Sequence, residues 1–144
     1  MHGMIAIRAA RPEDTEFLGW AIHEAARGHL ARGWFDIVLQ RDRQFCLEFC
    51  RRLTVAAARS WWHWSLFSVA DVDGARASAL CGFGDESVYR ASGEAMKEAS
   101  NAMGISEAER AYRKAGFTFA EEKRASEFEA AMGAPGLRRL ARDI

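Results

Sequence analysis

The stretch SLFSVADVDGARASALCGFG, residues 65–84, decides how this chain folds. Residues 65–72 and 77–83 are two runs of strand-forming and small side chains, and Asp73 and Gly74 lie between them. Asp-Gly between two such runs is typical of a type I′ turn, because both central residues of that turn need a positive φ angle. The stretch therefore predicts a β-hairpin and a sheet that is at least partly antiparallel.

A short strand and two helices are predicted before the hairpin. Residues 4–8 form a β-like run that stops just before Pro12, and proline suits the first position of a helix. Residues 29–38 are expected to form an ordered loop between the two helices. Apolar residues at helical spacing predict those helices: Phe17, Leu18, Ala21, Ile22 and Ala25 in the first, and Phe45, Cys46, Phe49, Cys50, Leu53 and Ala57 in the second, over residues 40–59.

Helices and short strands are also predicted after the hairpin. Residues 85–104 are expected to be partly helical, and residues 106–115 form a cleaner helix. Residues 117–123 and 137–144 have the pattern of strands. This order of elements predicts an α+β fold, with residues 1–144 as a single domain and helices flanking a mixed, largely antiparallel sheet.

The composition is that of an ordinary globular protein. Of 144 residues, 49% are hydrophobic and 28% are charged, which suffices for a core and argues against a disordered tail. Twenty basic residues balance 20 acidic ones, so nucleic-acid binding through bulk charge is disfavoured. No apolar run approaches the roughly 20 residues of a membrane helix, and residues 1–10 lack a secretory pattern. We therefore expect a cytoplasmic protein with neither membrane nor nucleic-acid partners.

The spacing of cysteine and histidine argues against a disulfide framework and against a metal site. The three cysteines, Cys46, Cys50 and Cys81, contain no Cys-x-x-Cys pair, and the four histidines show no paired ligand spacing. Cys46 and Cys50 lie four residues apart in a predicted helix, so both are expected to face the core. His23 and Glu24 in the first helix could act as bases, but we expect them to be solvated.

Two stretches of the chain resemble the GCN5-related N-acetyltransferase (GNAT) superfamily. In residues 4–104, a strand, the motif Arg-x-Ala-x-Pro-Glu-Asp, two helices and the hairpin look like the β-α-α-β-β opening of that fold. Residues 105–144 resemble its late helix-strand part, because AERAYRKAGFTFAEEKR (108–124) matches Ala-x-x-x-Tyr-x-Lys-x-Gly-Phe. The resemblance implies the transfer of an acetyl group from acetyl-CoA to a primary amine.

The chain departs from the family in its centre. Between the hairpin and the late helix, GNAT proteins have further strands and a glycine-rich turn whose amides hold the pyrophosphate of acetyl-CoA, but only residues 85–105 stand there. The one formal match to that turn is RASGEA, residues 90–95, which assigns Arg90 and Gly93 to cofactor binding. The alternative is an ordinary loop-to-helix stretch with an incidental glycine. We expect an abridged GNAT-like fold.

The resemblance also implies roles for single residues. Tyr112 matches the acid that protonates the leaving thiolate. Lys114 is assigned to the phosphate tail of the cofactor, and the alternative is that it belongs to a solvated face. His29, Trp34 and Asp36 lie on the side where relatives bind the acceptor, which we expect to be a small-molecule amine or a peptide amine. The alternatives are a packing role for Tyr112, and a loop that Trp34 anchors with a satisfied Asp36. Acetyl-CoA is the expected co-substrate, and no metal is expected.

A cluster of tryptophans precedes the hairpin. Alternation into the strand predicts Trp62 and Trp64 on one face, with Trp61 and His63 on the other. A role in the core or in a subunit interface is favoured over the stacking of a ligand.

Two functions remain open. The chain is either an N-acetyltransferase of the GNAT type, impaired or inactive in this abridged form, or a non-catalytic GNAT-like module for binding or assembly. The missing centre leaves a strand edge uncovered, and an unpaired edge invites pairing with a second chain. A homodimer is therefore expected in either case.

Overall fold

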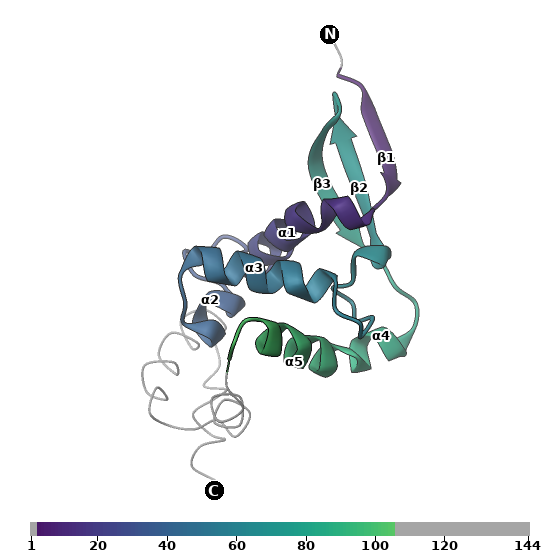
Figure 1. The fold of residues 1–144 in the computed structure, drawn as a ribbon. Coiled ribbons are helices and arrows are strands. Elements are labelled where there is room, and N and C mark those ends of the chain that lie inside the picture. Colours follow the sequence, from purple (N-terminus) through teal and green to yellow (C-terminus); the bar gives the residue numbers. More distant parts are fainter. Residues whose placement is uncertain (1–2, 106–144) are drawn as a thin grey trace, which may run out of the picture.

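The computed structural model describes residues 3–105, which form a layer of helices beside a small sheet (Figure 1). The elements in chain order are β1 (Ile5–Ala9), η1 (Pro12–Asp14), α1 (Thr15–Arg27), α2 (Trp34–Leu39), α3 (Arg43–Thr54), η2 (Trp64–Leu66), β2 (Phe67–Val72), β3 (Ala75–Cys81), α4 (Glu86–Arg90) and α5 (Ser92–Ala102). The helix expected over 106–115 and the strands expected over 117–123 and 137–144 lie outside the described residues.

The predicted hairpin is confirmed. β2 and β3 pair antiparallel, and Asp73 and Gly74 between them have φ angles of 50° and 81°, as a type I′ turn requires. β1 also pairs antiparallel with β2, with Ile5 opposite Val72, so the strand order is β1-β2-β3. Residues 3–105 therefore have the α+β class and the antiparallel pairing that the sequence predicts.

A buried carboxylate joins the sheet to the first helix. Asp14 is 1% exposed and accepts hydrogen bonds from the guanidinium groups of Arg8 in β1 and Arg76 in β3. It also accepts one from the backbone N–H of Arg11 at 2.8 Å. Although burial opposes it, the hydrogen bond from Arg8, together with those from Arg76 and Arg11, holds the pKa of Asp14 well below its usual range. Because Arg8 also bonds Asp71 of β2 at 2.8 Å, all three strands are tied to the start of α1.

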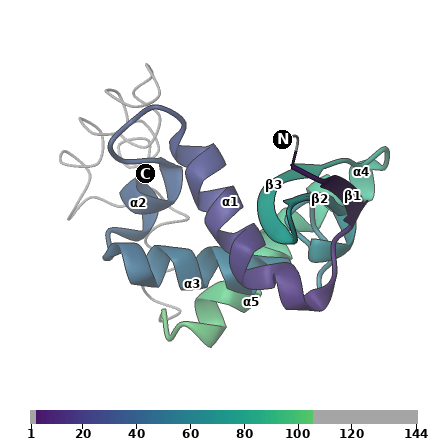
Figure 2. The same cartoon turned by 90° about the horizontal axis from the view of Figure 1, so that it is seen from above.

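The helices α1 and α3 approach each other closely, and α3 lies between α1 and α5 (Figures 1 and 2). The contact is tight at Gly19 of α1, where an added Cβ would lie 2.7 Å from the backbone nitrogen of Arg51 in α3. The core fills the space between these helices and the inner face of the sheet. Its fully buried side chains include Leu18, Cys46, Phe49, Cys50, Leu53 and Val69.

The prediction of a loop over residues 29–38 is wrong in its second half, because α2 begins at Trp34. Asp36 stabilises the start of this short helix, because its carboxylate accepts a hydrogen bond from the N–H of Gly33 at 2.8 Å. The helix ends at Leu39, and the next residue, Gln40, caps it with a left-handed φ of 51°. Six residues are too few to display a helical repeat, so apolar spacing could not reveal this element.

The second predicted helix is confirmed, but it is shorter than residues 40–59. α3 begins at Arg43 because the side chain of Asp42 accepts a hydrogen bond from the amide three residues on, at 2.8 Å. It ends at Thr54, and the carboxylate of Glu98 in α5 then accepts two backbone N–H groups of the following turn. The apolar spacing in the sequence predicted a longer helix, because it does not show this contact with Glu98, which is remote in sequence.

A test of the helix contact compares two glycines. Gly19→Ala should lower the free energy of unfolding by about 2 kcal/mol, because the new methyl group would collide with the backbone of α3. Gly93→Ala in α5 is the matched control, since nothing lies within 4 Å of its added Cβ. That variant should raise stability by up to about 1 kcal/mol through helix propensity. Urea unfolding of both variants measures the difference, and equal effects would contradict the close approach.

A second test concerns Asp14. Asp14→Asn should lower the free energy of unfolding at pH 7 by about 2 kcal/mol, because it removes a buried ionic partner of two arginines. Since the pKa of Asp14 is lowered in the folded state, its contribution is complete above about pH 5 and is lost progressively as the pH falls below that. Urea unfolding from pH 7 to pH 2 should therefore show wild type and variant converging in stability.

The control for Asp14 is an exposed ion pair. Glu86 and Arg90 have side chains that are 87% and 79% exposed, so Glu86→Gln should change stability by less than about 0.5 kcal/mol. A constant gap between wild type and Asp14→Asn at every pH would contradict the role assigned to the carboxylate.

Candidate functional site

An apolar groove of about 590 Å³ lies between α1, α2 and the outer strand β3. On the α1 side it is lined by small side chains, among them Ala21, Ala25 and Ala26. Its other walls are mainly aromatic, and the rings that line it are Trp34, Phe35, Trp61, Trp62, Phe67 and Phe83. A concave apolar surface with this many rings is typical of a binding site.

The turn that carries Trp61 is anchored to β3 and to α4. The thiol of Cys81 donates to the carbonyl oxygen of Trp61 at 3.0 Å, and the N–H of Trp61 donates to the carbonyl oxygen of Val88 at 3.1 Å. Its ring also packs edge-on against Tyr89, with centroids 5.0 Å apart. Within residues 3–105, the Nε1 of Trp61 is buried and has no hydrogen-bond partner.

The prediction that strand alternation places the tryptophans is wrong. β2 begins only at Phe67, while Trp64 is the first residue of η2 and Trp61 lies in a turn. His63 caps η2 by accepting a hydrogen bond from Ser65 N–H. Trp62 and Trp64 nonetheless pack against the hydrophobic core, which is one of the two roles that the sequence favours.

The strand β3 borders the groove and is an edge of the sheet formed by residues 3–105. Apolar side chains stay exposed there, because Leu80 of β3 is 73% exposed and Phe83, just after the strand, is 46% exposed. The sole charged residue in β3 is Arg76, and its guanidinium is held by Asp14. This edge therefore lacks the free charged side chains that protect many edge strands.

The outer face of the sheet is also apolar and exposed. Ile5 lies opposite Val72, and Ile7 opposite Ala70, so these side chains share the face that α1 does not cover. Ile5 and Ile7 are 68% and 78% exposed. Leu80 belongs to the same face, because it lies opposite Ser68, which in turn lies opposite Ala9.

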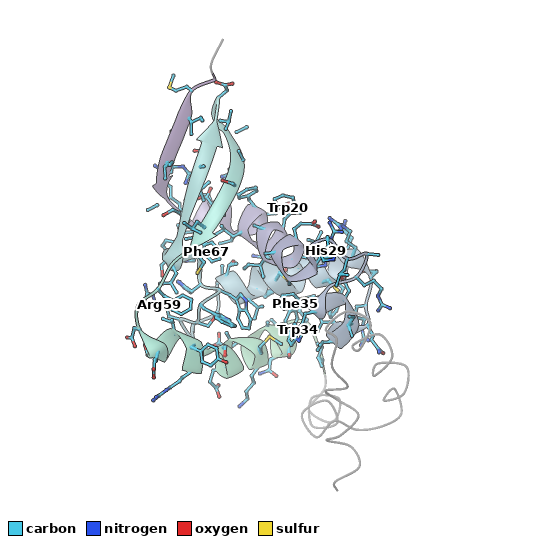
Figure 3. All side chains as sticks on the ribbon, turned by 180° about the vertical axis from the view of Figure 1, so that it is seen from behind. Trp20, His29, Trp34, Phe35, Arg59 and Phe67 are labelled. Atoms are coloured by element: carbon cyan, nitrogen blue, oxygen red, sulfur yellow. The ribbon has the colours of Figure 1, made fainter. Side chains whose placement is uncertain are left out.

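The three predicted acceptor residues differ in their surroundings, and their role in binding an acceptor stays a prediction. Trp34 lines the groove beside Phe35, whereas His29 is an exposed residue of the turn after α1 (Figure 3). The two carboxylate oxygens of Asp36 accept from Gly33 N–H and bond the ring of His23. The carboxylate of Asp36 is therefore already satisfied within the protein.

The predicted cofactor residues in the described part of the chain lie in helices. Arg90 is the last residue of α4, where it pairs with Glu86 at 3.2 Å, and Gly93 is the second residue of α5. Their assignment to a phosphate loop stays a prediction. Tyr112 and Lys114 lie outside the described residues.

A buried polar group joins the first three helices. His23 of α1, Asp36 of α2 and Cys46 of α3 each offer a donor atom, and the three atoms lie within 4.8 Å of one another. The Nε2 of His23 is 2.9 Å from Oδ1 of Asp36. The expectation that His23 is solvated is wrong, because the residue is 2% exposed. No spacing in the sequence indicates this group, since each member comes from a different helix.

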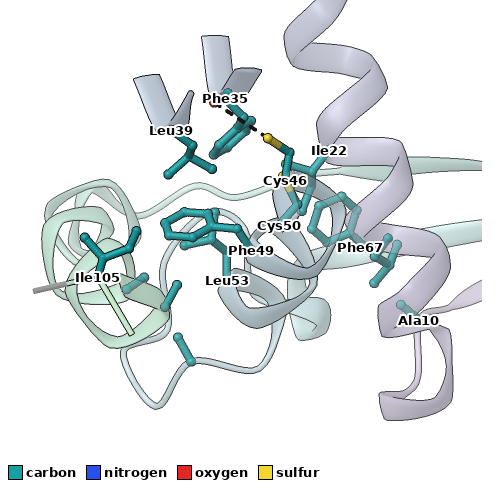
Figure 4. Close-up of a cluster of buried hydrophobic side chains, with 14 of the residues drawn as sticks. Ala10, Ile22, Phe35, Leu39, Cys46, Phe49, Cys50, Leu53, Phe67 and Ile105 are labelled. Carbon is teal, nitrogen blue, oxygen red and sulfur yellow. Dashed lines mark hydrogen bonds between the residues drawn. The ribbon is translucent and has the colours of Figure 1, made fainter. Parts of the chain in front are cut away.

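The thiol of Cys46 is not arranged as a nucleophile. Its Sγ lies 4.0 Å from the carbonyl oxygen of Phe35 (Figure 4) and 3.8 Å from that of Arg41, and its single proton can be donated to either oxygen. Burial and then the nearby charge of Asp36 raise the pKa of Cys46 to about 11, so the thiol is protonated at neutral pH. Cys46 and Cys50 both face the core, as predicted.

The carboxylates beside this group are ionised. Burial alone would raise the pKa of Asp36, but the hydrogen bonds from Gly33 and His23 together lower it below its usual value. For Glu24, the hydrogen bond from Arg27 is the largest effect, and the pKa is again lowered. Oε1 of Glu24 lies 3.6 Å from Nδ1 of His23, a nitrogen that is buried and has no hydrogen-bond partner within residues 3–105.

Comparisons with protein-family models, with curated proteins and with solved structures gave no match. Among residues 3–105, no helix is long and apolar enough to cross a membrane.

Proposed function

We propose that this chain is a non-catalytic assembly module, in which β3 pairs antiparallel with β3 of a second copy. The observation that carries the proposal is the edge itself, which within residues 3–105 is an uncovered strand beside a groove of aromatic side chains. Pairing about a twofold axis would join two three-stranded sheets into one continuous sheet.

The chemistry of the edge favours a second copy as the occupant. β3 reads ARASALC, and with Arg76 held by Asp14 it presents small and apolar side chains to a partner strand. Two identical strands of this kind meet without like charges opposite each other, which would otherwise disfavour antiparallel self-pairing.

The groove adds apolar area to the same surface. Leu80 and Phe83 line its rim and are 73% and 46% exposed. In the proposed dimer, Leu80 and Phe83 of each copy contact the groove rim of the other copy, so that apolar surface is buried on both. This proposal corresponds to the second function left open by the sequence, a non-catalytic GNAT-like module for assembly.

The test introduces a charge at the edge. Light scattering on the full chain after size-exclusion chromatography should give a dimer at micromolar concentration. Leu80→Lys should weaken that dimer at least about tenfold, because lysine on an edge strand opposes pairing. Since Leu80 is 73% exposed, the variant should still fold, and circular dichroism checks this.

The matched control is Ile7→Lys, which places the same charge at an equally exposed position of β1, on the same face of the sheet but at its other edge. We expect Ile7→Lys to stay dimeric. A wild-type monomer at every concentration would refute the proposal, and equal weakening by both variants would move the interface from the β3 edge to the sheet face.

Acetyl transfer is a second candidate function, and the order of elements favours it. A strand, helices and an antiparallel hairpin follow one another in residues 5–81, as in the opening on which the GNAT resemblance rests. On this proposal Tyr112 is the acid, and Arg90, Gly93 and Lys114 contact acetyl-CoA. The acceptor amine would lie near His29, Trp34 and Asp36.

Calorimetry with acetyl-CoA distinguishes the two proposals. For an assembly module we expect no binding heat up to about millimolar acetyl-CoA, whereas a transferase should bind in the micromolar range typical of enzyme substrates. If binding and turnover are observed, Tyr112→Phe should lower turnover at least about 100-fold, because a general acid is lost. Unchanged turnover would remove Tyr112 from the mechanism.

A further inference from the structure

We propose that His23, Asp36 and Cys46 form a zinc site that holds α1, α2 and α3 together. The three donor atoms already lie within 4.8 Å of one another. Tetrahedral zinc with bonds of about 2.0–2.3 Å places its ligand atoms roughly 3–4 Å apart. The three donor atoms would therefore move by about an ångström when zinc binds. This site is independent of the β3 edge and of any acetyl-CoA site.

The donor set selects the metal. An imidazole nitrogen, a carboxylate oxygen and a thiolate sulfur are ligands that zinc accepts together, whereas magnesium and calcium require oxygen ligands. Zinc releases the proton of a coordinating thiol, so the ion faces two negative ligands, the carboxylate of Asp36 and the thiolate of Cys46. The charges then sum to zero, which suits a site whose histidine and cysteine are 2% and 0% exposed.

The surroundings of His23 supply an independent argument. Nε2 faces Asp36, but the opposite nitrogen, Nδ1, is buried without a hydrogen-bond partner and lies 3.6 Å from Oε1 of Glu24. When a metal occupies Nε2, the ring proton resides on Nδ1, 3.6 Å from that carboxylate. Histidine ligands of metals usually donate their second nitrogen to a carboxylate in this way.

Glu24 is held in position for this role. Its carboxylate accepts hydrogen bonds from Arg27, one turn along α1, and from Arg43 at the start of α3, the latter at 3.2 Å. Asp36 can likewise bind the ion with Oδ1 while Oδ2 keeps its bond to Gly33 N–H. The side chain of Asp36 is 16% exposed, and with three protein ligands the proposed zinc would take water as its fourth ligand.

Cobalt substitution tests the site. The full chain, stripped with a chelator and titrated with Co²⁺, should take up one ion and develop visible bands of tetrahedral cobalt with a near-ultraviolet thiolate band. Zn²⁺ should abolish both signals and raise the melting temperature. If wild type shows no thiolate band and no change in melting temperature with Zn²⁺, the proposal is refuted.

Two cysteines on one helix provide a matched pair of variants. Cys46→Ser should abolish the thiolate band and weaken zinc binding more than about 100-fold. Cys50→Ser, one turn further along α3 and equally buried, should leave both unchanged, because Cys50 is not in the group. Loss of the band in Cys50→Ser but not in Cys46→Ser would overturn the assignment of ligands.

A third variant tests the role of Glu24, and its result can be interpreted even if a cysteine variant does not fold. Glu24→Gln should weaken zinc binding about 10-fold while the thiolate band remains, because Glu24 orients a ligand without binding the ion. Unchanged affinity would contradict the role given to Nδ1.

Discussion

The rest of the fold depends on the close approach of α1 and α3. Because Gly19 has no side chain, the backbone of α1 packs directly against the backbone of α3. The helix α3 also contacts α5. This contact fixes the direction of α1, which carries one wall of the groove and the histidine of the buried group. A larger side chain at Gly19 would therefore disturb both places at once.

The position of the sheet follows from Asp14. A carboxylate that is 1% exposed needs its arginine partners, so the strands that carry Arg8 and Arg76 must meet the start of α1. Once Arg76 is engaged there, β3 has no charged side chain left to guard its edge. One ionic cluster thus orients the sheet on the helices and engages the charged side chain of β3, the edge strand of the sheet within residues 3–105.

The groove and the buried group differ in the interaction they offer. The groove is lined by rings and methyl groups and gains by withdrawing apolar area from water. The buried group is polar, and His23 leaves one ring nitrogen without a hydrogen bond within residues 3–105. A buried ring nitrogen without a hydrogen-bond partner costs free energy. On the two proposals made above, a second copy of the chain covers the first surface, and zinc binds the second.

The sequence by itself determined the features that depend on neighbouring residues: the turn at Asp73-Gly74, the start of the first helix after Pro12 and the stripe of α3. It did not predict α2, because six residues show no helical repeat. Nor did it predict the group around His23, because His23, Asp36 and Cys46 share no spacing along the chain. Only the packing of three helices brings them within reach, since distance in space is set by tertiary contacts and not by separation in sequence.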